Sequence, residues 1–475
     1  MAALRTVPSR KRGPPVSTTV PTEVDRAAAQ PLHRRILFPP SSPAETPRIL
    51  HSSAHETLDP LILDLIALSL RAYVTPWYNG SISRDPDKAF LQAVMAVLIH
   101  VVQALEVRLA AVDWADVLLA ELPEVLANHY RDWDSAVERA GGGTAHNLSV
   151  DEMFHSLQPH IAIHLRQAAE GETTARHRVT PEVDRVYLRA LVDRLLKLLL
   201  PPEDYRSDTE RAIVREIIVA VVFGTVFNRV AQPWFIHGLI AKQLEAREAE
   251  RAVMEKALSA EDRTASTGLV DKALTALLSL PLLLASLASL ASTFSALSSS
   301  TRTTSSNLSS SPPPHQSLSA LLLAILPSSA FLSQLVYLVS LPLAFFSSQL
   351  DSFLAQSVTE HVCAASTVKA AMEGAIKGMF PNDGWPAPKE DDPDEEAQDE
   401  LRRRCEEALA RALSPFLPSL LFPRLPPEPP DPRIHLARHL LRPLACHTAN
   451  VHLFLSIVDL VVGKVFPELI VAPED

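Results

Sequence analysis

Cysteine and histidine side chains are the residues of this chain best suited to nucleophilic chemistry or metal binding. Cys446 and His447 are neighbours, which places a thiol beside an imidazole base. Adjacent residues of a helix point about 100° apart, however, so these two side chains are not expected to face each other. His155, His160 and His164 lie close together, but without cysteine or acidic residues at the spacing of a zinc site. We therefore expect packing and capping roles here, and no bound metal.

The sequence contains none of the common catalytic motifs. There is no GxSxG nucleophile elbow, no Walker phosphate loop, no HExxH and no paired-carboxylate motif. The glycine triplet at 141–143 lacks the strand and the lysine that a phosphate-binding loop needs. The sequence thus predicts a protein that is not an enzyme and uses no cofactor.

The composition favours a helical intracellular protein. Of its 475 residues 47% are hydrophobic and 21% charged, which is enough to bury cores in two or three domains. Glycine is scarce, and the apolar residues are mostly Leu, Ala and Val, so an all-α fold is expected. The three cysteines are far apart, which fits a reducing cytosol. A net charge of −11 and the lack of a basic stripe with aromatic residues disfavour nucleic acid as a partner.

Apolar residues recur every three or four positions, which is typical of amphipathic helices. Leu58-Asp59-Pro60 is typical of a helix start, and Ser149 with Glu152 three residues later resembles a capping box. No strand alternation of useful length competes with this pattern. We expect helices at about 58–72, 88–109, 113–129, 149–170, 181–200, 208–228, 234–258, 433–441 and 444–465.

The middle of the chain is almost free of charge. Between Lys272 and Asp351 the one formally charged side chain is Arg302. Two apolar arms, 273–291 and 318–346, flank a polar Ser/Thr/Pro-rich insert and must be shielded from water. Three possibilities stay open: a helical assembly that holds lipid, a hairpin embedded in a membrane, or an ordinary protein core. Either arm is long enough to cross a hydrocarbon layer of about 30 Å.

Large apolar residues of the first arm fall on one helical stripe, and small residues fill the other side. Such a helix can press its large residues into a core or against acyl chains. We predict lipid contacts for Leu283, Leu287, Leu290, Phe294, Leu322, Phe331, Leu335 and Phe345.

Several motifs resemble the PX-associated (PXA) domain of sorting-nexin relatives. They are VTPWYNGSISRD at 74–85, ALEVRL at 104–109, LPEVLANHY at 122–130, FHSLQPHIAIH at 154–164 and ERAIVREIIVAVVFGTVFNRVAQPWFIHGLI at 210–240. Near the other end, CHTANVHLFLSIVDLVVGKVFPEL at 446–469 resembles the nexin-C region. No segment resembles a phosphoinositide-binding PX domain or an RGS domain, so the arrangement is similar to short fungal PXA proteins.

The resemblance implies structural roles for the residues that carry it. Arg108 and Arg215 would be costly to bury unpaired, so each is expected to reach a carboxylate or a helix C-terminus. The residues singled out are Trp77, Tyr78, Arg108, His129, Pro159, His160, Arg215, Glu216, Pro233, Trp234, Asn450, His452, Phe466 and Pro467.

The composition and periodicity predict an all-α protein, and the resemblance implies a multi-helix PXA domain that packs with a nexin-C-like region around an apolar cavity. The N-terminal tail and internal loops are expected to be disordered. The expected parts are a basic Pro-rich tail at 1–57, a PXA-like domain at 58–260, apolar arms at 264–350 with a Ser/Pro loop at 298–317, a helical connection at 351–381, an acidic linker at 382–399 and a nexin-C-like region at 400–470.

The resemblance also implies a function. We expect a non-enzymatic protein that binds membrane lipids or acyl chains and transfers lipid or tethers organelles where the endoplasmic reticulum, vacuole or lipid droplet meet. The alternative is a membrane-anchored helical scaffold in endosomal or vacuolar trafficking, without lipid transfer. The expected location is cytoplasmic, peripheral or hairpin-anchored on intracellular membranes, with organelle-tethering proteins as possible partners.

Overall fold

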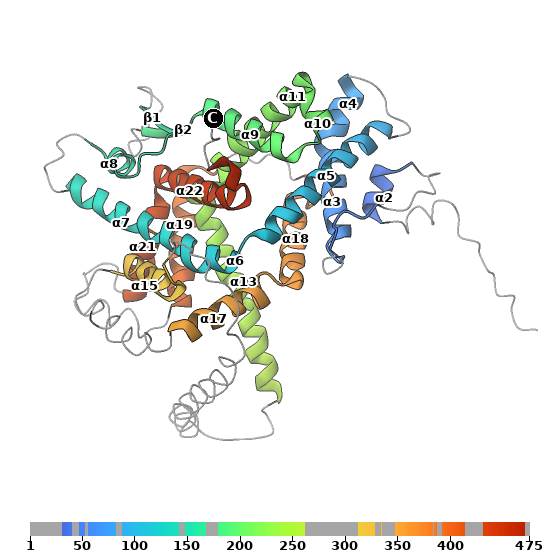
Figure 1. The fold of residues 1–475 in the computed structure, drawn as a ribbon. Coiled ribbons are helices and arrows are strands. Elements are labelled where there is room, and N and C mark those ends of the chain that lie inside the picture. Colours follow the sequence, from blue (N-terminus) through green and yellow to red (C-terminus); the bar gives the residue numbers. More distant parts are fainter. Residues whose placement is uncertain are drawn as a thin grey trace, which may run out of the picture. The chain divides into compact units, whose positions relative to one another are not determined.

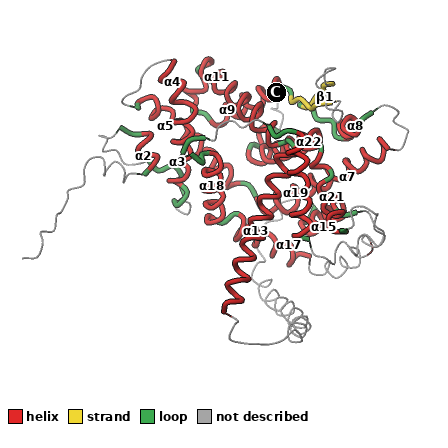
Figure 2. Tube along the Cα trace, turned by 180° about the vertical axis from the view of Figure 1, so that it is seen from behind, coloured by secondary structure: helices red, strands yellow, loops and turns green. Residues whose placement is uncertain are grey.

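The protein is helical apart from one short β-hairpin and an isolated bridge, within the residues that the computed structural model describes (Figures 1 and 2). The predicted all-α class is therefore confirmed. The described residues are 31–39, 47–52, 56–81, 88–141, 148–167, 179–261, 312–327, 334, 347–382, 384–386, 392–413 and 431–470. The chain divides into two compact units, Met1–Val102 with Lys369–Pro388, and Gln103–Val368 with Lys389–Asp475.

The first unit is built from short helices. They are α2 (Leu32–Leu37), α3 (Asp59–Ser69), the π-helical segment η2 (Leu70–Val74), α4 (Thr75–Ser81), the start of α5 (Ala89–Ala111) and the end of α18 (Ala365–Met379). As predicted, α3 begins at Asp59 with proline in its first turn. The Asp64 carboxylate accepts hydrogen bonds from the backbone N–H of His33 and contacts its ring, so α2 is held against α3.

The second unit contains most of the helices and the hairpin. Its elements are α6 (Trp114–Asp116), η3 (Val117–Glu121), α7 (Leu122–Gly141), α8 (Val150–Leu157), β1 (Ile163–Gln167), β2 (Val179–Val183), α9 (Arg185–Leu199), α10 (Pro202–Arg206), α11 (Asp208–Ile218), η4 (Val219–Phe227), α12 (Asn228–Val230), α13 (Pro233–Glu261), α15 (Pro314–Ile325), α17 (Ser347–Ser357), η6 (Val358–Val362), α19 (Glu395–Ala412), α21 (Pro432–Leu441), η7 (Pro443–Ala445), α22 (His447–Val465) and η8 (Pro467–Leu469).

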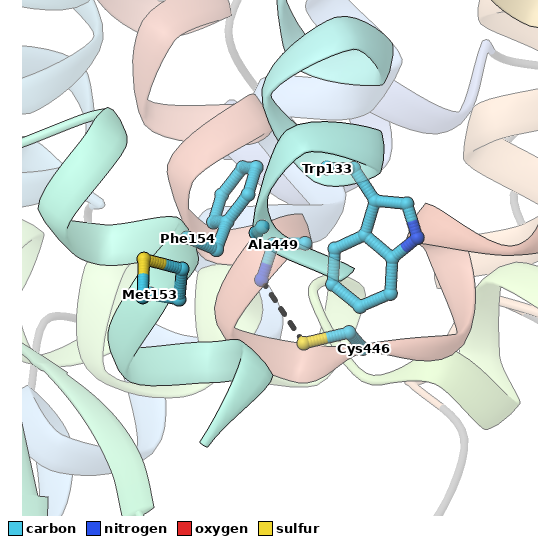
Figure 3. Packing of buried hydrophobic residues seen from close by; sticks show 6 residues of the cluster. Trp133, Met153, Phe154, Cys446 and Ala449 are labelled. Atoms are coloured by element: carbon cyan, nitrogen blue, oxygen red, sulfur yellow. Dashed lines mark hydrogen bonds between the residues drawn. The ribbon is translucent and has the colours of Figure 1, made fainter. Parts of the chain in front are cut away.

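The core of this unit forms where α22 packs against α7 and α8. Phe154 of α8 is fully buried and shares a cluster with Trp133 of α7 and with Cys446 and Ala449 at the start of α22 (Figure 3). Cys446 caps α22, since its sulfur accepts a hydrogen bond from the Ala449 N–H at 3.5 Å. Segments about 300 positions apart in the chain therefore share one apolar cluster.

A second contact joins α13 to α19, which run side by side in both views (Figures 1 and 2). The Arg404 guanidinium donates to Glu245, and Arg411 donates to Glu248 at 3.2 Å. The α19 helix begins at Glu395, inside the segment expected to be an acidic linker. Its first turn is capped by the Asp394 carboxylate, which explains why acidic residues suit this helix start.

The expectation of no strands was wrong at one place. The Ser149 capping box is present, but α8 ends at Leu157 rather than near residue 170. After it, β1 pairs antiparallel with β2, with Ile163 opposite Val183. Each strand is five residues long and buries one side chain well, so its alternation is too weak to detect in sequence. Pairing of the two segments supplies the backbone hydrogen bonds that define them.

The apolar arms fall mostly outside the described residues. Residues 273–291 are not described, and of the second arm α15 contributes its beginning. There Leu321, Ala324 and Ile325 pack against Ala127 and Tyr130 of α7. This part of the arm contacts protein.

Replacing Phe154 by alanine tests the core. Removing a fully buried phenyl ring from contact with Trp133 leaves a cavity and lowers the free energy of unfolding by about 3–5 kcal/mol. Urea unfolding followed by circular dichroism measures the loss. Val186→Ala, at a side chain that is 70% exposed, is the control and changes stability by less than about 0.5 kcal/mol. Equal losses in the two variants would show that the cluster does not organise this unit.

Candidate lipid-contacting surface

The helix formed by α11 and η4 carries an exposed aliphatic surface, which we call the α11–η4 face. Its side chains are between 39% and 55% exposed, although all are Val or Ile. They are Ile213, Val214, Ile217, Val221, Val222 and Val226. Spacings of four residues place 213, 217 and 221 on one stripe and 222 and 226 beside it. Isolated exposed aliphatic residues are ordinary, but a contiguous set marks an interaction site.

The opposite side of the same helix is packed into the protein. Val219 joins a buried cluster with Leu188, Val192 and Leu196 of α9. The helix is thus apolar on both sides, and only one side is covered by described residues. A soluble helix that faces water normally exposes polar residues there.

Ion pairs fix this helix to α9. Arg189 of α9 donates to Glu216 at 2.9 Å, and Arg215 lies 3.6 Å from the Asp193 carboxylate. Hydrogen bonds from Arg189 lower the pKa of Glu216. The predicted Arg215–Glu216 motif therefore lies at the base of the α11–η4 face and orients it.

The backbone of the face is unusual as well. Val219–Phe227 forms π-helical turns over nine residues, the longest of the π-helical segments among the described residues, the others being η2, η3 and η6. Residues 217–228 contain no charged side chain. This uncharged run was visible in the sequence, but it was interpreted there as a closing helix of the domain, and its residues were not among the predicted lipid contacts.

Of the predicted lipid contacts, Leu322 alone lies within the described residues, where it is 50% exposed on α15. The other seven are outside the described residues, so the prediction for them stands as it was made. They are Leu283, Leu287, Leu290, Phe294, Phe331, Leu335 and Phe345.

Histidines surround Phe154 where α7, α8 and α22 meet. His129 and His452 pack edge-on against its ring, with centroids 5.3 Å and 5.5 Å away. His155 approaches His452, with 3.1 Å between ring nitrogens. Burial lowers the pKa of His129 to about 4, and burial together with the neighbouring histidines lowers that of His452 to about 3. Both rings are therefore neutral packing elements at neutral pH.

His160 has a different environment. Its Nε2 lies 2.8 Å from the Asp459 carboxylate of α22, and the Tyr187 hydroxyl donates to the same carboxylate at 3.1 Å. Burial, followed by the Asp459 charge, raises the pKa of Tyr187 to about 12. This trio attaches α9 and the turn after Pro159 to α22.

Cys446 and His447 do not form a nucleophile–base pair. The Cys446 thiol donates to Asp151 at 2.9 Å, whereas the His447 ring contacts the Gln232 side chain at 3.3 Å. Burial raises the pKa of the thiol, which disfavours the reactive thiolate. The arrangement agrees with the divergence expected for neighbours in sequence.

Asn450 is fully buried and ties α22 to two other backbone segments. Its Nδ2 donates to the carbonyls of Ala231 and Leu444, at 3.0 Å each. Pro233 begins α13 just after this junction, and Trp234 lies beneath the Arg229 guanidinium, 5.4 Å from it.

The remaining motif residues lie in two places. Arg108 donates to Glu468 at 3.0 Å and to the Val465 carbonyl at the end of α22, and it lies over the Phe466 ring, just before Pro467. Tyr78 stacks on Phe90 in the first unit, with ring centroids 3.8 Å apart. The Trp77 side chain is outside the described residues.

Two helices among the described residues, α5 and α22, have the length and apolar composition of a membrane span. This is weak evidence, because core helices share these properties. For α22 the buried contacts with α7 and α8 explain its apolar character.

Asn450→Leu tests the junction at α22. Leucine has a similar size but donates no hydrogen bond, so the carbonyls of Ala231 and Leu444 lose a buried donor. We expect the free energy of unfolding to fall by about 2 kcal/mol or more, as measured by urea titration. Ser456→Ala, on a partly exposed side of α22, serves as control. An unchanged stability in Asn450→Leu would show that water satisfies these carbonyls.

The buried histidines predict acid sensitivity. Because the pKa of His129 is lower in the folded than in the unfolded protein, the unfolded state binds more protons below pH 6.5. The contribution of neutral His129 to the free energy of unfolding is therefore present above that pH and is lost as the pH falls towards 4. From pH 6.5 to pH 5 we expect His129 to account for a loss of about 1.5 kcal/mol.

His129→Leu should reduce the acid-dependent loss by about that amount in urea unfolding measured at the two pH values, whereas buried His452 keeps its own contribution. Leu455→Ala is the matched control, since it removes a buried group that does not titrate and lowers stability equally at both. The assignment is wrong if His129→Leu keeps the full acid-dependent loss.

Comparison with known proteins finds relatives for part of the chain, mainly within its first half. Residues 55–243 match the family model described as PXA domain. The chain is 32% identical over 169 residues to PXA domain protein 1 of Schizosaccharomyces pombe, a match that covers 36% of this chain and 30% of that protein. Sorting nexin-13 of Mus musculus is 25% identical over 186 residues, 38% of this chain and 18% of that protein. Sorting nexin-25 of Mus musculus is 24% identical over 191 residues, 40% of this chain and 20% of that protein.

These matches span at most 30% of the relatives' own length. The family match ends at residue 243 and includes the whole α11–η4 face. The resemblance of residues 446–469 to a nexin-C region lies beyond it and stays a prediction. No solved structure gives a significant match.

Proposed function

We propose that this chain, whose residues 55–243 match the PXA domain and are similar to sorting nexins, is a non-enzymatic, membrane-associated lipid-binding protein of intracellular trafficking. The observation that carries the proposal is the α11–η4 face within the PXA domain. The described residues leave six Val and Ile side chains of this face about half exposed. Membrane lipids or acyl chains are the apolar partners that such a face suits.

Energetics favour contact with lipid at this face. Full burial of a Val or Ile side chain is worth about 1.5–3 kcal/mol, so covering six half-exposed ones contributes roughly 5 kcal/mol. The ion pairs of Arg189 and Arg215 on the inner side keep the helix attached to α9. The helix therefore lies along an apolar surface rather than crossing it, as expected for peripheral association.

The proposal extends to lipid transfer or organelle tethering. The uncharged arms between Lys272 and Asp351 supply further apolar surface for acyl chains, and the α11–η4 face supplies an entry surface. Contacts among the endoplasmic reticulum, vacuole or endosome and lipid droplet are the proposed location, with membrane lipids and organelle-tethering proteins as partners. Two of the relatives are named sorting nexins, and this name supports a trafficking role.

One observation favours a second candidate, a helical scaffold without lipid transfer. The start of the second arm packs on α7, where Ala324 and Tyr130 are both buried. If the rest of the arm continues in this way, it completes a core and leaves no room for lipid. The two candidates differ in whether the protein removes lipid from a membrane.

The α11–η4 face is tested by the double variant Ile217→Glu/Val221→Glu. Two carboxylates on this face should lower the fraction of protein that floats with phosphatidylcholine vesicles by about tenfold, because charge opposes contact with the apolar layer. Val186→Glu/Val253→Glu, at side chains 70% exposed outside the face, is the matched control and should float like the parent protein. Unchanged flotation of the first variant would refute the proposed surface.

The same variants distinguish transfer from scaffolding. Delipidated protein that extracts a fluorescent acyl lipid from vesicles, and loses this ability in Ile217→Glu/Val221→Glu, supports transfer. Flotation without extraction supports the scaffold.

A further inference from the structure

The register of the β1–β2 hairpin shows which of its backbone groups point outward. The Ala162 carbonyl accepts a hydrogen bond from the Asp184 N–H at 2.7 Å, so these residues form a hydrogen-bonded pair at the base of the hairpin. Hydrogen-bonded and non-hydrogen-bonded pairs alternate along an antiparallel ladder. Leu165, opposite Pro181, and Gln167 therefore belong to pairs of the second kind, whose backbone groups point away from the neighbouring strand.

One outer edge of this hairpin is blocked, and the other is open. On β2 the outward position is held by Pro181, which has no N–H to donate and so protects that edge. On β1 the outward positions are Leu165 and Gln167, and within the described parts of the chain no residue bonds to their outward N–H or carbonyl groups. The Ile163 N–H reaches the His160 carbonyl at 3.0 Å, so the open edge begins after it.

Helix α22 holds the hairpin in position. Ile163 of β1 and Val183 of β2 share a cluster with Val451 and Leu455 of α22. An isolated two-stranded hairpin is marginally stable at best in water, but this one is packed against a helix. Its open edge is therefore already ordered, which lowers the entropic cost of adding a strand to it.

The side chains of β1 indicate what kind of strand fits. Alternation along the strand places His164 and Arg166 on one face and Leu165, which is partly buried, on the other. His164 lies 3.9 Å from the Asp184 carboxylate. Arg166 is exposed, and among the described residues it has no ion-pair partner, although Glu182 lies one pair further along the ladder. An acidic side chain on an added strand would supply that partner.

A second copy of this chain does not meet this requirement. Antiparallel pairing of two β1 strands about Leu165 would place Arg166 opposite His164 of the second copy, because the pairs on each side of the centre are exchanged. A shift by one step of the ladder would place the two Arg166 side chains opposite each other. Both registers bring basic side chains together, which is unfavourable directly across a sheet.

We propose that the open edge of β1 binds an extended segment of another protein, which adds a strand whose acidic side chains alternate with apolar ones. Backbone hydrogen bonds to Leu165 and Gln167 provide the attachment. Arg166 selects acidic residues on one face of the added strand, and Leu165 selects apolar residues on the other. This site is separate from the α11–η4 face and does not depend on the function proposed for it.

The experiment titrates the full chain into short fluorescein-labelled peptides and follows fluorescence anisotropy. The first peptide alternates valine and glutamate, the second alternates valine and lysine, and the third repeats the first with methylated valine nitrogens. We expect the first peptide to bind at least about tenfold more tightly than the other two. Lysine is repelled by Arg166, and methylation removes the donors that would reach the Leu165 carbonyl.

Variants of the chain separate the two contributions. Arg166→Glu should weaken binding of the valine–glutamate peptide about tenfold or more and strengthen binding of the valine–lysine peptide, because the charge at the edge is reversed. Gln167→Pro removes an outward donor and should also weaken the first peptide. Arg194→Glu reverses an exposed charge on α9 and is the matched control, which should bind like the parent protein.

Three results would overturn the proposal. The first is equal binding of the three peptides, and the second is a loss in Arg194→Glu as large as that in Arg166→Glu. The third is a dimer in sedimentation that Gln167→Pro dissociates, which would assign the edge to a second copy of the chain. Loss of flotation in Ile217→Glu/Val221→Glu concerns the α11–η4 face and leaves this test intact.

Discussion

Burial of α22 is the constraint on which the second unit depends. Its first turns are buried on most sides, and α7, α8 and β2 supply the enclosure. Enclosing a helix also buries its polar groups, and each requires a partner. Asn450 meets two carbonyls and the Cys446 thiol meets Asp151, so the polar residues specify where the apolar helix lies.

The same constraint explains the histidines around Phe154. Imidazoles fill the space between α7, α8 and α22 with flat rings that pack edge-on against the phenyl group. Their burial is tolerated while they are neutral, which makes this junction a place where the protein's stability responds to acid. A helix junction that links the PXA domain to the C-terminal region is thus both tightly packed and titratable.

The α11–η4 face contrasts with α22, because it is apolar and uncovered. In α22 the apolar surface is matched by protein, whereas Ile217 and Val221 face outward although the inner side of their helix already packs on α9. Exposing such an apolar surface to water is unfavourable, and this is the physical basis for proposing a lipid partner. The open edge of β1 is a separate feature of different character, since it offers backbone hydrogen bonds where the face offers apolar area.

The sequence by itself determined most of the helices, because the periodicity of apolar residues and caps such as Asp59-Pro60 and Ser149 with Glu152 are local signals. It also identified the motif residues, among them Asn450 and His160, but not what they contact. Tertiary structure alone decided the β1–β2 pairing and its open edge, the place of α22 and the side of α11–η4 that stays exposed. The physical reason is that periodicity shows that a helix has an apolar face, whereas contacts between distant segments decide whether that face is covered.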